Sequence, residues 1–124
     1  MKLQPDRVDT LAIHAYGPGW IAVNGQKWEQ SVVVSSSGDL RAWGGSRLQD
    51  LTQAHFDGLA DGRPELVIFG SGAQMRFVSP ALLRGLIERG IGVETMDTPA
   101  ACRTYNILAG EGRRVVAALL LEGL

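Results

Sequence analysis

Three side chains in one predicted helix have the clearest chemical potential in this sequence: Cys102, Arg103 and Asn106. A thiol in the first turn of a helix and beside an arginine has a lowered pKa, which favours the nucleophilic thiolate. A guanidinium fork at Arg103 would hold a carboxylate or phosphate, and the Asn106 amide would orient it. One interpretation is therefore a small enzyme or an anion-binding protein with a pocket around these residues.

The same residues also have a structural interpretation. Free cysteine is among the most buried residue types, and no second cysteine or nearby histidine supports reactivity at Cys102. An arginine in the first turn opposes the helix dipole, so Arg103 needs a partner. The alternatives for that partner are Glu94, Asp97, Glu111 or a bound anion. A buried ion pair and anion recognition are both open.

The helix that carries these residues is predicted to begin at Thr98 and to end near Ala109. Thr98 followed by Pro99 is typical of a cap residue before a proline in the first turn, and Gly110 is a usual helix terminator. The residues between are apolar around most of the circumference, except for a stripe formed by the arginine and the asparagine. We therefore expect a helix buried on several sides.

A second candidate segment is Gly70-Ser71-Gly72, directly after the apolar strand predicted at Leu66–Phe69. Glycines there allow backbone N–H groups to approach an anion. The segment lacks the third glycine of a dinucleotide-binding motif and the lysine of a P-loop, so a plain tight turn is the alternative. The next predicted strand, Ile91–Met96, contains Glu94 and leads to Thr98. We expect both candidate segments to lie at one edge of the sheet.

The first half of the chain is typical of short antiparallel strands. Asn24-Gly25 is the strongest two-residue hairpin signal, and Gly17-Pro18-Gly19 is a turn. The predicted strands are Leu11–Tyr16, Trp20–Val23, Ser31–Ser35 and Leu40–Trp43.

The second half alternates between helices and strands. Thr52 begins a short helix that stops at Asp61-Gly62, and a second helix spans residues 80–89 with Gly90 as its C-terminal cap. Strands separated by helices imply right-handed crossovers and a partly parallel sheet. The predicted class is α/β, a single domain over residues 1–124, in which an N-terminal antiparallel β meander precedes α-β-α-β-α-β with a central mixed sheet. The last strand is predicted at Arg113–Leu121.

Composition excludes several function classes. A net charge of −1 argues against nucleic-acid binding. His14 and His55 lack the spacing of metal ligands, and no cofactor motif is present. The N-terminus has no apolar signal segment, and the longest apolar run, Val115–Leu121, is far shorter than the roughly 20 residues of a membrane helix. We expect a cytoplasmic protein with no cofactor, no metal and no membrane insertion.

The segments 90–108 and 111–115, together with Phe69-Gly-Ser-Gly72, form an unusual motif combination. On these motifs the chain resembles a family of small uncharacterised bacterial and archaeal proteins, whose eukaryotic members include mitochondrial NADH dehydrogenase (complex I) assembly factor 3. The resemblance covers nearly the whole chain. It implies a compact three-layer α/β domain with a central mixed sheet and an extra β layer. It carries over no catalytic residues, and its mitochondrial members act through protein contact.

The resulting hypothesis is a bacterial non-catalytic binding or assembly-factor-like domain. It predicts a surface near residues 70–76 and 94–106 that engages a protein partner or a small anionic ligand. An uncovered face or edge strand of the β meander also predicts a homodimer.

Overall fold

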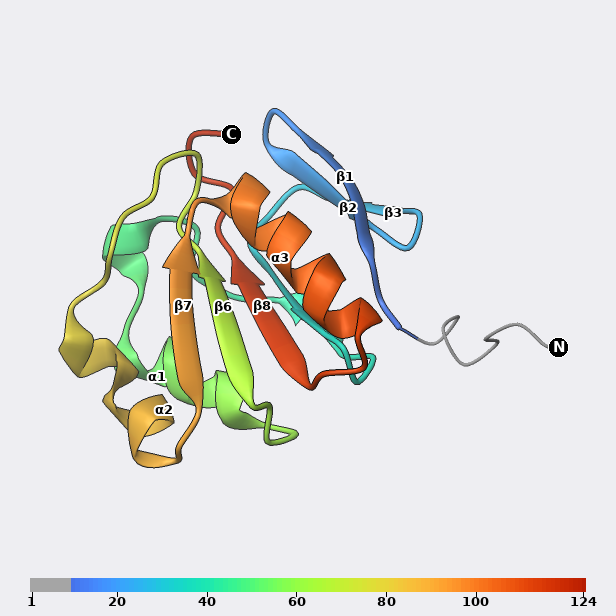
Figure 1. Ribbon diagram of the computed structural model, residues 1–124. Helices are drawn as coiled ribbons and strands as arrows, with labels where there is room; N and C mark the ends of the chain where they lie inside the picture. Colours follow the sequence, from blue (N-terminus) through green and yellow to red (C-terminus); the bar gives the residue numbers. More distant parts are fainter. Residues whose placement is uncertain (1–9) are drawn as a thin grey trace, which may run out of the picture.

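The computed structural model describes residues 10–124, which form two β-sheets and three α-helices (Figure 1). The strands are β1 Ile13–Gly17, β2 Trp20–Val23, β3 Gln26–Trp28, β4 Val32–Ser35, β5 Leu40–Ala42, β6 Leu66–Gly70, β7 Gly92–Met96 and β8 Val115–Leu119. The α-helices are α1 Gln53–Asp57, α2 Arg84–Glu88 and α3 Thr98–Gly110. The 3-10 helices are η2 Leu48–Asp50, η3 Gly58–Ala60 and η4 Pro80–Leu83.

The N-terminal sheet has the antiparallel order β1-β2-β3. The predicted hairpin at Asn24-Gly25 is confirmed: both residues have positive φ, 47° and 87°, as a two-residue type I′ turn requires. This turn joins β2 to β3, with Val23 paired to Gln26. The strand β3 was not predicted, because its residues are polar and show no apolar alternation.

The antiparallel meander is shorter than predicted. After β3 the chain changes sheets, and β4 and β5 join the central sheet instead. The side chains of Val32, Val33 and Val34 are all at most 1% exposed. Adjacent residues of a strand point to opposite faces, so a strand buried at every position needs cover on both faces, which only the central sheet offers.

The central sheet has the order β5-β4-β8-β6-β7. Its strands β8, β6 and β7 are parallel, whereas β4 runs antiparallel to both of its neighbours. This arrangement confirms the predicted α/β class with a central mixed sheet. Along β6, Leu66 pairs with Gly92 on one side and Val115 on the other, so all three parallel strands begin at one end of the sheet.

Two apolar cores lie on the two faces of the central sheet. On one face α3 and the three-stranded sheet cover residues that include Ile68 and Leu119, and Figure 1 shows α3 running across β6 and β8. On the other face α1 and the neighbouring helical turns enclose an aromatic cluster. In this cluster the rings of Trp43, Phe56 and Phe69 meet edge to face, with centroids 5.4 Å or 5.9 Å apart, an arrangement that aromatic pairs prefer. The domain therefore has three layers: α1 and α2 with the neighbouring helical turns, the central sheet, and α3 with the three-stranded sheet.

The first two predicted helices are shorter and less regular than expected. The helix after Thr52 is α1 followed by η3, and residues 80–89 divide into η4 and α2. The 3-10 helix has about 3.0 residues per turn against 3.6 in an α-helix. The apolar stripe therefore rotates out of register at the junction, and Ile87, predicted to belong to it, is 59% exposed.

Candidate functional site

The two predicted candidate segments do meet, at the carboxyl ends of β6 and β7. The Gly72 N–H donates to Thr98 Oγ1 at 2.9 Å, and the Thr98 N–H donates to the Gly72 carbonyl at 2.7 Å. The Thr98 hydroxyl donates in turn to the Leu120 carbonyl at 2.6 Å. Their shared edge was predicted correctly, and hydrogen bonds within the protein occupy these polar groups.

Thr98 is not the cap of α3, as the Thr-Pro pair had suggested. The cap is Asp97, whose carboxylate accepts a hydrogen bond from the Ala100 N–H at 2.8 Å. Thr98 is the first helical residue and is fully buried. The Thr98 hydroxyl already donates to the Leu120 carbonyl, so Asp97 accepts the hydrogen bond from the first turn of the helix.

The glycines of Gly70-Ser71-Gly72 are required by close packing. A Cβ on Gly70 would lie 2.9 Å from both the Leu119 side chain and Thr98 Oγ1. Gly72 has φ +102°, and a Cβ there would lie 2.5 Å from the Glu122 carbonyl oxygen. These two glycines therefore allow α3 and the C-terminal segment to approach the end of β6.

Cys102 is 2% exposed and belongs to the core between α3 and the sheet. Burial raises the pKa of its thiol to about 12, although the Arg103 charge beside it acts in the opposite direction. Of the two interpretations, the structure agrees with the buried cysteine and not with the lowered thiol pKa, because desolvation outweighs the neighbouring charge. The thiol is protonated at neutral pH, which removes the nucleophile that the enzyme hypothesis needs.

Asn106 connects α3 to the N-terminal sheet. Its Oδ1 accepts from the Ile13 N–H at 2.9 Å, and its Nδ2 donates to the Ile13 carbonyl at 2.6 Å. Both ends of the amide are thus used by one residue of β1. The role of this side chain in the structure is to hold β1 against the helix.

Arg103 is exposed, and its guanidinium reaches the Tyr16 hydroxyl at 3.5 Å. The expected buried ion pair is wrong: within residues 10–124, Arg103 forms no ion pair with Glu94, Asp97 or Glu111. Water solvates this side chain, so it needs no carboxylate. The helix is also not buried all round, since Ile107 on its outer side is 61% exposed.

Glu94 lies in the middle of β7 and is exposed. β7 forms one edge of the central sheet, so its other side carries no paired strand within residues 10–124. The structure therefore does not bring Glu94, Cys102, Arg103 and Asn106 together as one pocket. The carboxyl end of β6 and the exposed edge beside it remain as the candidate site.

Arg76 and Glu122 shape this end of the sheet; Arg76 belongs to the predicted surface at residues 70–76, whereas Glu122 was not predicted. Arg76 Nη2 donates to Glu122 Oε1 at 2.7 Å, and the same oxygen accepts from the Leu48 N–H at 2.9 Å. These two hydrogen bonds lower the pKa of Glu122, and the bond from the Leu48 N–H has the larger effect. A hollow of about 260 Å³ lies where the loop after β6 meets the C-terminal segment. No spacing rule links residues so far apart in the chain, so the pairing of Glu122 with Arg76 and Leu48 could not be predicted from the sequence.

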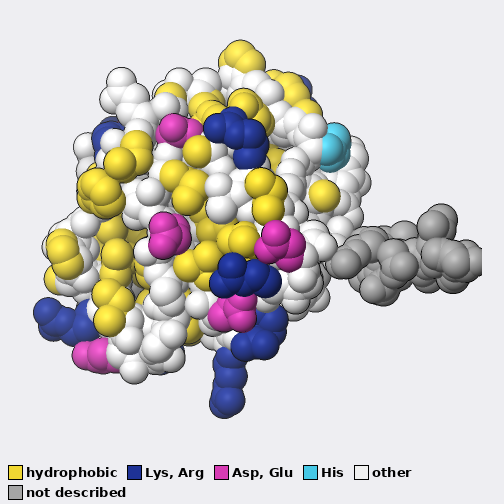
Figure 2. All heavy atoms as spheres, in the orientation of Figure 1, with side chains coloured by type: hydrophobic (Ala, Val, Ile, Leu, Met, Phe, Trp, Pro, Cys, Tyr) yellow, Lys and Arg dark blue, Asp and Glu magenta, His cyan; other side chains and the backbone are white. Residues whose placement is uncertain are grey.

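The same loop exposes two large apolar side chains. Phe77 is 70% exposed and Met75 is 51% exposed, whereas Val78 next to them is buried. In Figure 1 the loop runs from the end of β6 past the outer side of β7 to η4, and Figure 2 shows hydrophobic side chains gathered on that side of the molecule. Exposed apolar groups that cluster on a surface are typical of interaction sites.

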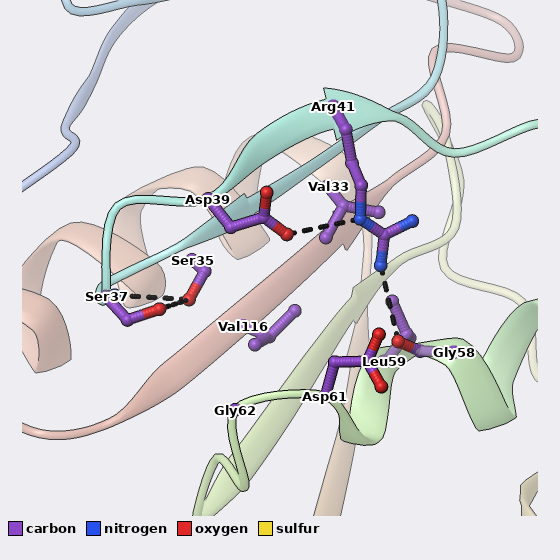
Figure 3. A pocket seen from close by; sticks show the side chains of 10 residues that line it. All are labelled: Val33, Ser35, Ser37, Asp39, Arg41, Gly58, Leu59, Asp61, Gly62 and Val116. Atoms are coloured by element: carbon purple, nitrogen blue, oxygen red, sulfur yellow. Dashed lines mark hydrogen bonds and ion pairs between the residues drawn. The ribbon is translucent and has the colours of Figure 1, made fainter.

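A smaller hollow lies on the face of the sheet that α1 covers, where Arg41 donates to Asp39 at 3.2 Å and to the Gly58 carbonyl at 3.3 Å (Figure 3). Its volume is about 120 Å³. A water molecule takes about 30 Å³ of liquid volume, so the hollow holds only a few of them.

In the part of the chain that the structure describes, no three His, Cys, Asp or Glu side chains are grouped to hold a metal ion. No described helix is long and apolar enough to cross a membrane.

The fold and this site define a small three-layer α/β domain whose exposed loop follows the central parallel strand. Residues 13–120 match the family described as a protein of unknown function (DUF498/DUF598), and the chain belongs to that family.

Three relatives illustrate the relationship. NADH dehydrogenase [ubiquinone] 1 alpha subcomplex assembly factor 3 of Bos taurus is 34% identical over 127 residues, which cover 95% of this chain and 65% of the relative. An uncharacterised protein of Rhodobacter capsulatus is 34% identical, and the match covers 94% of this chain and 90% of that protein. A crystal structure of a Bordetella parapertussis protein superposes with a TM-score of 0.84 at 40% identity, covering 91% of this chain and 97% of that one. The chain thus spans about two thirds of the length of the curated assembly factor.

Proposed function

We propose that this protein is a non-catalytic binding domain of the assembly-factor type, whose protein partner docks on the loop between β6 and η4. The observation that supports this proposal most directly is Phe77, a large aromatic side chain that is 70% exposed. Leaving a phenylalanine in water forgoes roughly 1.5–3 kcal/mol of burial free energy. A partner that covers Phe77 and Met75 recovers that free energy.

Hydrogen bonds and packing constrain the backbone on both sides of Phe77. Ser71 Oγ accepts from the Arg76 N–H at 2.9 Å and donates to the Gln74 carbonyl at 2.7 Å. Arg76 is tied to Glu122, and Val78 is anchored in the core. An aromatic side chain on a constrained loop loses little conformational entropy on binding, which is the usual property of an interface hot spot.

The outer edge of β7 extends the proposed surface. The backbone N–H and C=O groups of β7 that do not bond β6 point outward, on the side of the strand where Figure 1 draws the loop that carries Phe77. An extended segment of a partner protein would add to this edge as a further strand and would place an apolar side chain against Phe77.

The relative from Bos taurus supports the assembly-factor part of the proposal, because its name describes an assembly factor of NADH dehydrogenase. We therefore propose that the client of this chain is a subunit of its organism's own NADH dehydrogenase. The buried Cys102, with a thiol pKa of about 12, supports a role that requires no nucleophile.

The experiment is complementation of a deletion strain, with assembled NADH dehydrogenase measured by activity staining in native gels. We expect the deletion to lower the amount of assembled complex and the wild-type gene to restore it. Phe77→Ser should fail to restore it, because the change removes the apolar contact from an exposed position where folding is little affected. The matched control is Ile107→Ser, a similarly exposed apolar residue on α3, which should restore assembly.

Site-specific photo-crosslinking from position 77 and from position 107 gives a second readout. A crosslinked NADH dehydrogenase subunit at position 77 only would support the proposal. Full restoration by Phe77→Ser would remove the loop as the partner site. A deletion that leaves the assembled complex unchanged would remove NADH dehydrogenase as the client.

A further inference from the structure

At the end of the sheet opposite this loop, we propose a binding site for a small phosphate-bearing molecule. Three arginines, Arg63, Arg89 and Arg114, line one hollow of about 620 Å³. Known small-molecule pockets range from about 300 to 1,000 Å³. This site is independent of the partner surface proposed above.

The topology of the parallel strands brings the three arginines together. Arg63 precedes β6, Arg89 follows α2 on the way to β7, and Arg114 precedes β8. In the sheet, Leu66 pairs with Gly92 and with Val115, so the segments before these strands lie side by side. Figure 1 draws all three strand starts at the lower side of the molecule, and Figure 2 shows Lys and Arg side chains there with Asp and Glu side chains among them.

The lining of the hollow carries more positive than negative charge, with three arginines and one glutamate. Glu65, the acidic residue in its lining, is paired with Arg113 at 2.5 Å. Among residues 10–124, none of the three lining arginines forms an ion pair. Asp57 lies beside Gly85, close to Arg89, and is not bonded to it. Like charges around one hollow repel each other, and a bound anion removes that repulsion.

The guanidinium groups keep most of their donors available. Arg89 Nη1 donates to the Gly85 carbonyl at 2.8 Å, and Arg114 Nε donates to the Arg63 carbonyl at 3.2 Å. Each guanidinium has five N–H donors, so within residues 10–124 these bonds leave the Nε and Nη2 side of Arg89 and the Nη1 and Nη2 fork of Arg114 available. Such forks match the oxygens of phosphate in a bidentate geometry.

Arg63 occupies a backbone conformation that a long side chain rarely adopts. Its φ is 52°, and it directly precedes Pro64, which further restricts the preceding residue. Glycine or asparagine would fit this position with less strain. Strained non-glycine residues concentrate at functional sites, where the side chain has a role that outweighs the cost.

These observations indicate a soluble molecule with at least two negative charges and with phosphate groups small enough for the hollow. Pyrophosphate serves as the probe. Titration calorimetry at low ionic strength and NMR chemical-shift mapping of the full chain measure its binding. We expect saturable binding, with the largest shifts at the amides of Gly90, Gly92 and Arg114. Added salt should weaken the binding.

Three variants test the arginines. Arg89→Gln removes the charge, and Arg89→Lys keeps the charge but loses the fork. Arg63→Asn removes the guanidinium from a backbone that asparagine adopts readily, so its thermal midpoint should not fall. We expect each variant to weaken pyrophosphate binding, by about tenfold for the two that lose a charge. Arg103→Gln, which changes an exposed arginine on α3, should leave the affinity unchanged.

Three results would overturn the proposal: no binding of pyrophosphate at low ionic strength, equal affinities in Arg63→Asn, Arg89→Gln and Arg103→Gln, or shifts spread evenly over the protein's arginines. Citrate binding as tightly as pyrophosphate would overturn the phosphate preference. Because these readouts do not depend on Phe77, they fail or succeed separately from the assembly experiment.

Discussion

At the scale of single residues, two opposing effects act on the Cys102 thiol. The adjacent Arg103 favours the thiolate, but its guanidinium is exposed to water, which screens its charge. The thiol itself is 2% exposed, so ionisation would place a charge in the core. Desolvation is therefore the larger effect, and the residue acts as a small apolar side chain.

This burial predicts how stability depends on pH. The unfolded thiol ionises near its ordinary pKa of 9.0, and the folded thiol near a pKa of about 12. Between these values the unfolded chain loses the proton first, so the contribution of Cys102 is complete below pH 9 and decreases as pH rises towards 12. The slope is at most about 1.4 kcal/mol per pH unit.

Chemical denaturation of wild type and Cys102→Ala on either side of pH 9 should show the difference in unfolding free energy shrinking at high pH. A constant difference would contradict it.

At the scale of elements, α3 joins the two sheets. One side of the helix packs on β6 and β8, and Asn106 on another side bonds β1. The Tyr105 hydroxyl adds a bond to the Leu11 carbonyl at 2.8 Å, and burial raises the pKa of this phenol. The polar stripe on an otherwise apolar helix thus serves the attachment of the three-stranded sheet.

Replacing Asn106 by alanine should loosen that attachment. The change leaves both backbone groups of Ile13 without partners, and we expect a loss of about 1–3 kcal/mol in the free energy of unfolding. Urea denaturation measures the loss, and amide exchange should show reduced protection in β1 before β6. Arg103→Gln on the same stripe should change stability by less than about 0.5 kcal/mol. Equal effects of the two variants would show that the amide does not hold β1.

At the scale of the whole molecule, the two ends of the parallel strands differ. The carboxyl end is closed by bonds among Gly72, Thr98 and the C-terminal segment, and the apolar loop projects beside it. The amino end opens into the arginine-lined hollow. We propose that one end binds a protein and the other a small anion. The predicted homodimer and cytoplasmic location stay predictions.

Closure of the carboxyl end depends on Gly72. Its φ is positive, and a Cβ there would clash with the Glu122 carbonyl. We expect Gly72→Ala to combine both costs and to reduce stability by about 2–4 kcal/mol. Gly112→Ala is the matched control, because Gly112 has φ +84° and open space where the Cβ would lie. This control should lose only about 1–2 kcal/mol. Thermal denaturation compares the two. Equal losses would mean that the C-terminal segment moves aside at little cost.

Much of the fold could be predicted because local patterns have local causes. The Asn24-Gly25 turn, the apolar strand at Leu66–Phe69 and the helix that ends at Gly110 each depend on the residues themselves. The assignment of β4 to the central sheet could not be predicted, since pairing with β8 joins residues that are distant in the chain, such as Val32 and Leu119. The position of Thr98 within the helix was also misjudged, because its hydroxyl bonds the Leu120 carbonyl.

The sequence by itself determined the order of helices and strands, the mixed sheet and the edge that Gly70-Ser71-Gly72 shares with Thr98. Only the tertiary structure decided which polar groups remain available at the surface. Solvation and pairing depend on neighbours that are distant in the chain. The core buries Cys102, and the Asn106 amide bonds the backbone of Ile13. Three arginines from separate segments line one hollow. A thiol or guanidinium changes its chemistry with that environment, which residue type and spacing alone do not specify.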